Sequence, residues 1–340
     1  MRNLQALNVA QRRLVFFLIF GGVIFALVAV TWFLISLTLG TGERVMAVSL
    51  VPGVTVREFA ALPDDDSYPP AVAVAENGTV YTGSFSSGAV WAITPDGATV
   101  TEIPETREAI GAVVGLAVAP DGALLVGDQI DTDPRSAGGL VHRVAGGTVT
   151  TFATINDDRG FVAPNDIALD AEGRVYVSDS GRNEVWRFEP DGSGGRVWWV
   201  PPSTQTDTRR AVTGLAYDPV DDALIITDPE INEIYSTPIA GGATELIYYH
   251  GVREDPPGFD GVTVSPDGVI YVAALGQNGI GIIDDGHLDY IVGLFRGASD
   301  VAWGEPNRLY VTNFDQSSLV IPIVDPQLPF ALDVIEFEGQ

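Results

Sequence analysis

Asn165 and Asp260 are the residues of this sequence whose side chains and positions best suit the binding of a divalent cation. Each stands directly before a short apolar segment, and Thr213 and Ser299 occupy the corresponding positions before two other segments. Carboxylate and amide oxygens are typical Ca²⁺ ligands. In a hydrolase, Asp260 would act as a base or a metal ligand, with a water activated by the metal as the nucleophile. The alternative is that Asn165 and Asp260 only cap turns, a common role for both residue types.

Four further residues are candidates for the same site. Asp128, Asp179 and Asp228 each end an apolar segment, where Asp is also an ordinary turn residue. Asp128 lies in the acidic stretch GDQIDTDPRS, which lacks the glycine and terminal glutamate of an EF-hand and is better interpreted as a solvated loop. His250 is the only histidine that leads toward one of the apolar segments. No two histidines have the spacing of a metal site, so structural or exposed roles are favoured.

The composition narrows the classes of function. The chain has 340 residues, no cysteine, and 45 acidic against 18 basic residues, which gives a net charge of -27. Such a charge repels nucleic-acid phosphates, so we expect no nucleic-acid partner. Thiol chemistry and Cys-ligated metals are excluded. No P-loop, G-x-S-x-G or dinucleotide-binding glycine pattern occurs in a fitting context, so we expect no organic cofactor. Ca²⁺ or another divalent cation is the cofactor that the candidate residues suit.

The candidate residues belong to a sequence repeat. Six segments each consist of an apolar run, a turn rich in Asp, Asn, Gly or Pro, and a second apolar run, which is typical of a β-hairpin. They are AVAVAENGTVYTGS from Ala71, GLAVAPDGALLVGD from Gly115, DIALDAEGRVYVSD from Asp166, GLAYDPVDDALIITD from Gly214, GVTVSPDGVIYVAA from Gly261 and DVAWGEPNRLYVTN from Asp300. Their starts are 44, 51, 48, 47 and 39 residues apart, the period of four-stranded propeller blades. The sequence therefore predicts an all-β, six-bladed β-propeller over residues 54–340.

The propeller topology places the candidates at one end of the central channel. In each blade, the start of the first strand and the end of the second lie on the same face, so the residues before the six starts are expected to ring the channel mouth, where propellers bind ligands. They are Pro70, Val114, Asn165, Thr213, Asp260 and Ser299. Strand alternation is expected to turn Asp166 and Asp300 to the other side. Residues 54–62 and 331–339 are both candidates for the strand that closes the ring.

Residues 14–40 form an uncharged apolar stretch of 27 residues. A membrane span needs about 20 such residues, whereas the apolar core of a cleaved signal has about 7–15. The stretch therefore predicts an uncleaved transmembrane signal-anchor. Arg12 and Arg13 precede it, so the positive-inside rule places residues 1–13 in the cytoplasm and the propeller outside. Residues 41–53 would form a stalk. The chain is thus predicted to be a single-pass membrane protein.

The best-formed repeat, PNDIALDAEGRVYVSDSGRNEVWRFEPDG, resembles two known families. Its first part is similar to the Pro-Asn-Asp stretch of the senescence-marker-protein/gluconolactonase family and its second part to an NHL repeat. The repeats over residues 54–338 also resemble the paraoxonases and strictosidine-synthase-like proteins of the same six-bladed superfamily. The gluconolactonase resemblance implies a divalent metal held by a Glu, one or two Asn and an Asp. Asn165 and Asp260 match two of these positions, whereas Pro70 and Thr213 stand at the other two.

Two classes of function remain open. In the first, the protein is an anchored, metal-dependent hydrolase of small lactones or esters, as the resemblance to gluconolactonases implies. In the second, it is a non-catalytic binding propeller, similar to NHL-repeat modules, that holds a protein partner or serves as an accessory subunit of a membrane complex. The matching Asn165 and Asp260 favour the hydrolase, and the residues at the two departing positions favour the binding module.

Overall fold

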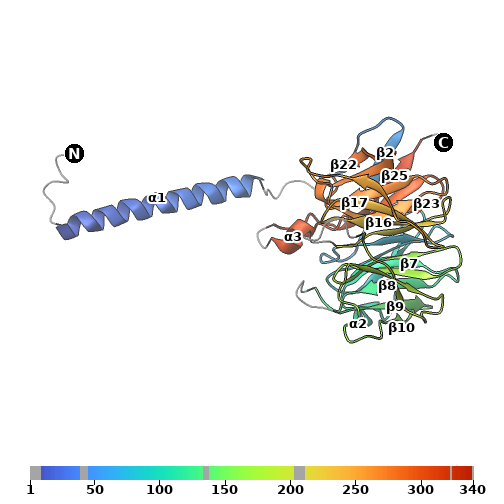
Figure 1. The fold of residues 1–340 in the computed structure, drawn as a ribbon. Helices are drawn as coiled ribbons and strands as arrows, with labels where there is room; N and C mark the ends of the chain where they lie inside the picture. Colours follow the sequence, from blue (N-terminus) through green and yellow to red (C-terminus); the bar gives the residue numbers. More distant parts are fainter. Residues whose placement is uncertain (1–8, 39–44, 133–137, 203–210, 322–323, 339–340) are drawn as a thin grey trace.

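The computed structural model describes residues 9–38, 45–132, 138–202, 211–321 and 324–338. Its strands form six antiparallel sheets (Figure 1). The first strands of the sheets contact one another in a closed ring, in the order β3, β7, β11, β15, β19, β23 and back to β3. The predicted six-bladed propeller is therefore confirmed.

The first five blades follow the order of the chain, each with its first strand at the channel. Blade 1 consists of β3 (Val72–Val74), β4 (Val80–Gly83), β5 (Val90–Ile93) and β6 (Val100–Glu102). Blade 2 consists of β7 (Val113–Val118), β8 (Leu124–Asp128), β9 (Leu140–Ala145) and β10 (Thr148–Ala153). Blade 3 consists of β11 (Pro164–Leu169), β12 (Val175–Asp179), β13 (Glu184–Phe188) and β14 (Arg196–Trp199). Blades 4 and 5 are formed by β15 (Leu215–Asp218), β16 (Ala223–Asp228), β17 (Glu233–Pro238) and β18 (Glu245–Tyr249), and by β19 (Phe259–Val264), β20 (Ile270–Ala274), β21 (Gly279–Asp284) and β22 (His287–Gly293). Short helical segments are α2 (Thr106–Ala109), η2 (Leu275–Gln277) and α3 (Gln316–Val320).

Blade 6 joins the two ends of the propeller sequence. It consists of β23 (Val301–Gly304), β24 (Arg308–Val311), β25 (Ala331–Phe337) and β2 (Val54–Ala61). β2 pairs antiparallel with β25, from Val54 opposite Phe337 to Ala61 opposite Ala331. Both segments predicted as candidates for closure therefore lie in this blade, and the N-terminal one supplies its outermost strand.

The N-terminal segment also packs on blade 5. β1 (Val48–Ser49) pairs antiparallel with β22, with Val48 opposite Gly293, and adds a fifth strand to that sheet. The described part of the segment that we expected to be a stalk thus lies against the propeller, because its backbone completes the free edge of a sheet. The remainder, residues 41–44, lies outside the described residues.

The core consists of apolar clusters between neighbouring blades, one at each of the six contacts around the ring. All residues of the second strands β8, β12 and β16 are buried, whereas the outer strands β10 and β14 are largely exposed. In the contact between blades 6 and 1, the rings of Phe59 and Tyr310 lie 4.7 Å apart, in the same cluster as the fully buried Trp91. Burial of each such side chain stabilises the fold by about 1.5–3 kcal/mol.

The turn between the first and second strands requires a left-handed residue in every blade. Blades 4 and 6 have Asp222 and Asn307 there, at φ of 50° and 48°. These residue types tolerate the left-handed region better than other side chains. The other four blades have glycine, at Gly78, Gly122, Gly173 and Gly268. The Asp-Gly and Asn-Gly pairs of the repeat are therefore explained by backbone geometry.

The N-terminal helix α1 (Val9–Thr38) precedes the propeller. Within it, the 21 residues Arg13–Phe33 are long and apolar enough to cross a membrane, and none of the most apolar window is buried in the molecule. In length and composition, this segment agrees with the apolar span predicted over residues 14–40.

Candidate functional site

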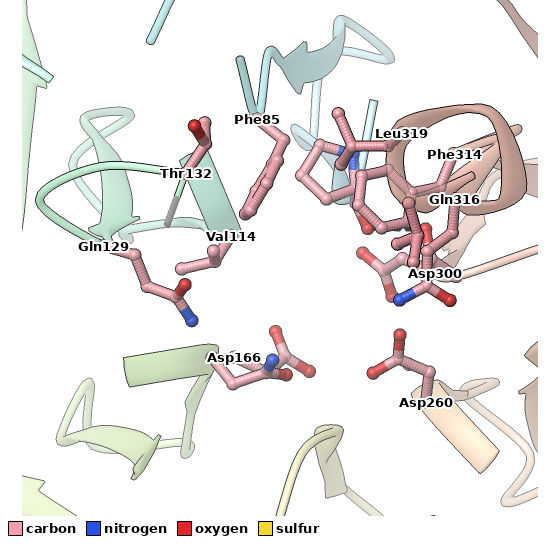
Figure 2. A pocket seen from close by; sticks show the side chains of 15 residues that line it. Phe85, Val114, Gln129, Thr132, Asp166, Asp260, Asp300, Phe314, Gln316 and Leu319 are labelled. Carbon is pink, nitrogen blue, oxygen red and sulfur yellow. Dashed lines mark hydrogen bonds between the residues drawn. The ribbon is translucent and has the colours of Figure 1, made fainter. Parts of the chain in front are cut away.

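A cavity of about 480 Å³ opens at the channel mouth. Figure 2 shows the carboxylates of Asp166, Asp260 and Asp300 directed into its interior. The rest of the lining is formed by Pro70, Phe85, Val114, Gln129, Thr132, Asn165, Gly261, Ser299, Phe314, Gln316, Leu319 and Val320. None of these described lining residues is Arg or His, so none of them neutralises the three carboxylates.

Asp166 and Asp300 each connect their own blade to the next one. The Oδ2 atom of Asp166 accepts a hydrogen bond of 2.8 Å from the backbone N of Leu215 in blade 4. The Oδ2 atom of Asp300 accepts one of 2.8 Å from the backbone N of Val72 in blade 1. Each Oδ1 atom accepts a bond from the N–H of the following residue. These two carboxylates are therefore fixed by the fold, at opposite positions of the six-bladed ring.

Asp260 differs from these two residues in its bonding. Its carboxylate makes no hydrogen bond within the described part of the chain, although its backbone O accepts one of 2.7 Å from the Thr227 hydroxyl. The neighbouring Asn165 side chain likewise forms no hydrogen bond with another described residue, and both side chains are partly accessible from the cavity. The free oxygens of Asp260 and Asn165 are thus available to a ligand.

The environment shifts the pKa values of all three aspartates upward. Burial raises the pKa of Asp166 to about 7, although two backbone N–H groups partly oppose the change. Burial raises the pKa of Asp260 to about 8, with the charge of Asp166 as the second cause. Burial, followed by the charge of Asp166, also raises the pKa of Asp300 well above its ordinary value. Burial and mutual repulsion therefore favour the protonated form of these carboxyls near neutral pH.

Part of the cavity wall is apolar. Phe85 and Phe314 meet edge to face there, with ring centroids 5.6 Å apart. Leu319 and Val320 of α3 and Val114 of blade 2 complete this side. The arrangement suits a ligand that has both an apolar part and a carbonyl or hydroxyl group.

Five of the six residues predicted to ring the channel mouth line the cavity, namely Pro70, Val114, Asn165, Asp260 and Ser299. The Ser299 hydroxyl donates to the backbone O of Pro70 at 2.9 Å and lies 2.8 Å from the Thr312 hydroxyl. Thr213 is buried, with its hydroxyl 3.2 Å from that of Thr227, and is not part of the lining. Its hydroxyl is therefore engaged within blade 4.

His250 lies outside the cavity, contrary to its proposed place at the mouth. Its Nδ1 atom lies 3.1 Å from the Tyr248 hydroxyl, and its Nε2 atom lies 3.2 Å from the backbone O of Glu254. The ring is held in the loop that follows β18, where its role is structural.

Asp128, Asp179 and Asp228 also lie outside the lining, because each of them caps a loop. The Oδ1 atom of Asp128 accepts bonds from the backbone N–H groups of residues 111 and 112, and its Oδ2 atom lies 3.0 Å from Nε2 of His142. Asp179 accepts bonds in the same way from residues 162 and 163, and Asp228 from residue 211. In blades 2, 3 and 4, the aspartate at the end of the second strand thus fixes the loop that leads into the first strand. This is the turn-capping role that we considered for these positions.

Asp166 and Asp300 are the residues that the sequence reasoning placed wrongly. We expected strand alternation to turn them away from the cavity. The pairing of β11 with β12 is irregular between Pro164 and Ile167, so alternation does not hold across Asp166. Asp300 precedes β23, which begins at Val301, and is not subject to alternation at all.

A signal for these two residues is present in the repeat. The four other blades have Gly or Ala at the aligned position, at Ala71, Gly115, Gly214 and Gly261. A Cβ atom on Gly261 would lie 2.0 Å from Oδ1 of Asp300, and one on Gly214 would lie 2.1 Å from the backbone O of Asp260. In blades 4 and 5, the neighbouring blade therefore leaves no room for a side chain at this position. An aspartate at such a crowded, buried position indicates a specific role for its carboxylate.

The donor groups of the cavity partly suit a divalent cation. The lining is anionic and offers oxygen ligands, as hard cations prefer, and Asp260 and Asn165 have free oxygens. Pro70 offers no side-chain donor, and no three His, Asp or Glu side chains of the described residues could hold one metal ion together. Asp260 and Asn165 therefore offer free side-chain oxygens to a cation, but the described residues of the lining do not form a complete ligand set.

Comparisons with solved structures agree with this architecture. A gluconolactonase from Xanthomonas campestris superposes with a TM-score of 0.61 and 15% identity, over 87% of this chain and 96% of that protein. The calcium-binding protein regucalcin from Agrobacterium tumefaciens gives a TM-score of 0.61 and 15% identity, over 84% and 95%. Virginiamycin B lyase from Staphylococcus aureus gives 0.55 and 18%, over 76% and 82%. At these identities the likeness shows a shared fold.

The family of the protein is identified from its amino-acid sequence. No match was found among curated proteins. The sequence model of the SMP-30/gluconolactonase/LRE-like region matches residues 105–315, which is more than half of the chain and includes Asn165, Asp166, Asp260 and Asp300. The chain therefore belongs to the SMP-30/gluconolactonase/LRE-like family of six-bladed β-propellers.

Proposed function

We propose that this protein is a hydrolase of lactones or related esters, anchored by α1 in a membrane, with its propeller outside the cytoplasm. The observation that carries the activity is the carboxylate of Asp260, which makes no hydrogen bond to a described residue and lies in a cavity of about 480 Å³. Burial and the charge of Asp166 raise its pKa to about 8. The family membership supports the same reaction class. Arg12 and Arg13 in the first turns of α1, which has no acidic residue, support the orientation.

Asp260 has the properties that proton transfer in this reaction requires. Hydrolysis of a lactone adds water to the carbonyl carbon and breaks the bond from that carbon to the ring oxygen. An ionised Asp260 would accept a proton from the attacking water and then return it to the leaving ring oxygen, so that one water is consumed overall. A pKa of about 8 keeps both forms of the carboxyl accessible near neutral pH, which favours both transfers.

The remaining lining residues position the substrate. Phe85, Phe314 and Leu319 form the apolar side, which would hold the hydrocarbon part of a lactone and exclude water from it. The amide groups of Gln129 and Asn165 can hydrogen-bond to the carbonyl or hydroxyl groups of the substrate. Asp166 and Asp300 are held by backbone N–H groups, so they keep the shape of the polar side.

A divalent cation would fit this proposal through Asp260 and Asn165. When bound, it would polarise the lactone carbonyl and favour the ionised form of Asp260. Its ligand set would differ from the one that the family resemblance implies, because Pro70 and Thr213 stand at two ligand positions. We therefore expect weaker binding of the cation than a complete set of charged ligands gives.

Titration calorimetry with CaCl₂ on the full chain in phosphatidylcholine nanodiscs tests this site. We expect binding to the unaltered chain and none to Asp260→Ala. Asp221→Ala is the matched control, because Asp221 is exposed in a loop on the opposite face, and it should bind like the unaltered chain. A screen of lactones and esters on the same three samples then measures hydrolysis. If the unaltered chain neither binds a divalent cation nor hydrolyses any lactone or ester, the proposal is wrong.

A non-catalytic binding propeller is the second candidate. Pro70 in the lining and the engaged Thr213 hydroxyl favour it, because both remove a metal ligand that the family resemblance implies. Under this alternative, the protein would hold a protein partner of a membrane complex. Crosslinking of the full chain in its native membrane, followed by mass spectrometry, would identify a reproducible partner in the absence of any hydrolysis.

A further inference from the structure

Exposed apolar side chains gather at one edge of the cavity mouth. We call this group the apolar rim; it consists of Val45, Met46, Leu294, Val320, Ile321 and Leu328. Val320 is 68% exposed and Leu294 is 58% exposed, which is unusual for side chains of this type. Val320 also lines the cavity, so the rim and the site share a side chain.

Hydrogen bonds hold the three segments of the rim together. The side-chain Oε1 atom of Gln327 accepts a bond of 2.8 Å from the backbone N of Val45. The backbone N of Gln327 donates to Oδ2 of Asp315 at 2.9 Å, and the guanidinium of Arg296 donates to the backbone O of Gln327. Figure 1 shows α3 standing out from the propeller beside the segment by which the chain enters it. The rim is therefore one surface, located where the propeller joins the N-terminal part of the chain.

The two faces of the propeller differ in the number of large apolar side chains that they expose. Exposed large apolar residues occur on the mouth face of other blades too, at Ile130, Val200 and Val252. In the described loops of the opposite face, Val220 is the only one, at 59% exposure. The asymmetry is not explained by the core, because these side chains project away from it.

Leu294 gives a second indication that the rim is not incidental. Its φ is 65°, in the left-handed region that a leucine side chain rarely adopts. Glycine or asparagine would relieve the backbone at an exposed position such as this one. The sequence instead retains a large apolar side chain that is mostly exposed.

The length of the connection to α1 limits what can cover the rim. Seven residue steps separate Thr38, the last residue of α1, from Val45 of the rim. An extended chain covers at most about 3.6 Å per residue, so Val45 stays within about 25 Å of the end of α1. If α1 crosses a membrane, the short connection therefore keeps the rim close to the membrane surface.

We propose that the apolar rim rests on the surface of the bilayer that α1 crosses, so that the cavity takes an apolar lactone or ester directly from the lipid. The inference rests on the proposed function for the anchor and the reaction, and it names the substrate class as lipid-partitioned. Val320 connects the bilayer-facing surface to the apolar side of the cavity. A short-chain, water-soluble lactone would instead have to enter from the solvent.

Site-directed spin labelling tests the contact with the bilayer without reference to activity. The chain has no cysteine, so a single introduced cysteine carries the label without further changes. Val320→Cys and Leu294→Cys report on the rim, and Val220→Cys, of similar exposure, is the matched control. The full chain is reconstituted in phosphatidylcholine vesicles, whose zero net charge avoids repulsion of the acidic protein.

We expect both rim labels to be more accessible to oxygen than to a water-soluble nickel chelate, and the label at Val220 to show the reverse. If the rim labels are as accessible to the chelate as the control, the rim does not contact lipid and the inference is wrong. This readout stands even if no substrate is ever hydrolysed, so it separates failure of the inference from failure of the proposed activity.

Kinetics in the same vesicles test the source of the substrate. Leu294→Asp places a charge on the rim, at a position that is not part of the cavity lining and whose backbone Asp tolerates. We expect this variant to lose most of its hydrolysis of a long-chain lactone carried in vesicles and to keep its hydrolysis of a short-chain soluble lactone. Val220→Asp should change neither rate. Equal loss for both lactones would contradict delivery from the bilayer.

Discussion

The raised pKa of Asp260 predicts that the propeller loses stability as the pH increases. The pKa of about 8 in the folded protein lies above the ordinary value of 3.8, which applies to the unfolded chain. Between these two values the folded protein keeps a proton that the unfolded chain has released. Unfolding therefore releases a proton, and it becomes more favourable at each higher pH. The contribution of Asp260 is fully present below about pH 4 and is lost by about pH 8.

The size of the effect follows from the same two values. One proton difference changes the free energy of unfolding by about 1.4 kcal/mol per pH unit. From pH 6 to pH 8, Asp260 alone should therefore reduce the stability of the fold by about 2 kcal/mol, because with a pKa of about 8 it is half ionised in the folded protein at the upper pH. Asn cannot ionise, so Asp260→Asn should remove this part of the loss. The part due to Asp166, whose pKa is raised to about 7, should remain.

Urea unfolding of the full chain in detergent, followed by tryptophan fluorescence, measures this difference. The free energy of unfolding is determined at pH 6 and at pH 8 for the unaltered chain, Asp260→Asn and the exposed control Asp221→Asn, in EDTA. We expect a gain of stability at pH 8 from Asp260→Asn and none from the control. Saturating CaCl₂ should also reduce the loss in the unaltered chain, if the cation binds Asp260. A variant with the same pH dependence as the unaltered chain would refute the assignment of a buried, neutral Asp260.

Two further predictions concern the contacts between blades. Asp300→Ala leaves the buried backbone N–H of Val72 without its acceptor, so we expect a loss of about 1–3 kcal/mol in the same urea experiment; a loss below a few tenths would mean that water replaces the carboxylate. Gly261→Ala places a Cβ atom 2.0 Å from Oδ1 of Asp300. We expect it to destabilise the fold by about 1–3 kcal/mol. The loss should be smaller but not absent in the background of Asp300→Ala, because Oδ1 is then missing whereas the Cα atom of residue 300 stays 2.7 Å from the new Cβ.

The sequence was sufficient to predict the propeller because each blade repeats the same physical pattern. The turn residues, the apolar strands and the period of about 40–50 residues are local features that six segments share. The strand that closes the ring was not predictable in this way. The sequences of residues 54–62 and 331–339 both suit a strand, and only the pairing of β2 with β25, from Val54 with Phe337 to Ala61 with Ala331, decides their order. The pairing of Val48 with Gly293 is likewise a long-range contact without a local signal.

The site was predictable only in part, for a related reason. The topology placed Asn165, Asp260 and Ser299 near the axis, and the structure locates all three in the cavity lining. The alternation rule failed for Asp166 because the ladder is irregular at that point. The apolar side was not foreseen, because Phe314 and α3 belong to a long insertion between β24 and β25 of blade 6 that has no counterpart in the repeat. A sequence repeat therefore predicts the strands and turns that all blades share, but not an insertion that occurs in one blade.

Asp260 is the position at which the function of the cavity can be separated from its fold. Asp166 and Asp300 each bind a backbone N–H of the next blade, so their replacement alters the ring as well as the charge of the cavity. Asp260 binds no such group among the described residues, and its charge is opposed by Asp166. In its ionised form it can only destabilise the fold unless a proton, a cation or a substrate compensates it. A carboxylate that lowers the stability of the fold in this way has the properties expected of a ligand-binding or catalytic residue.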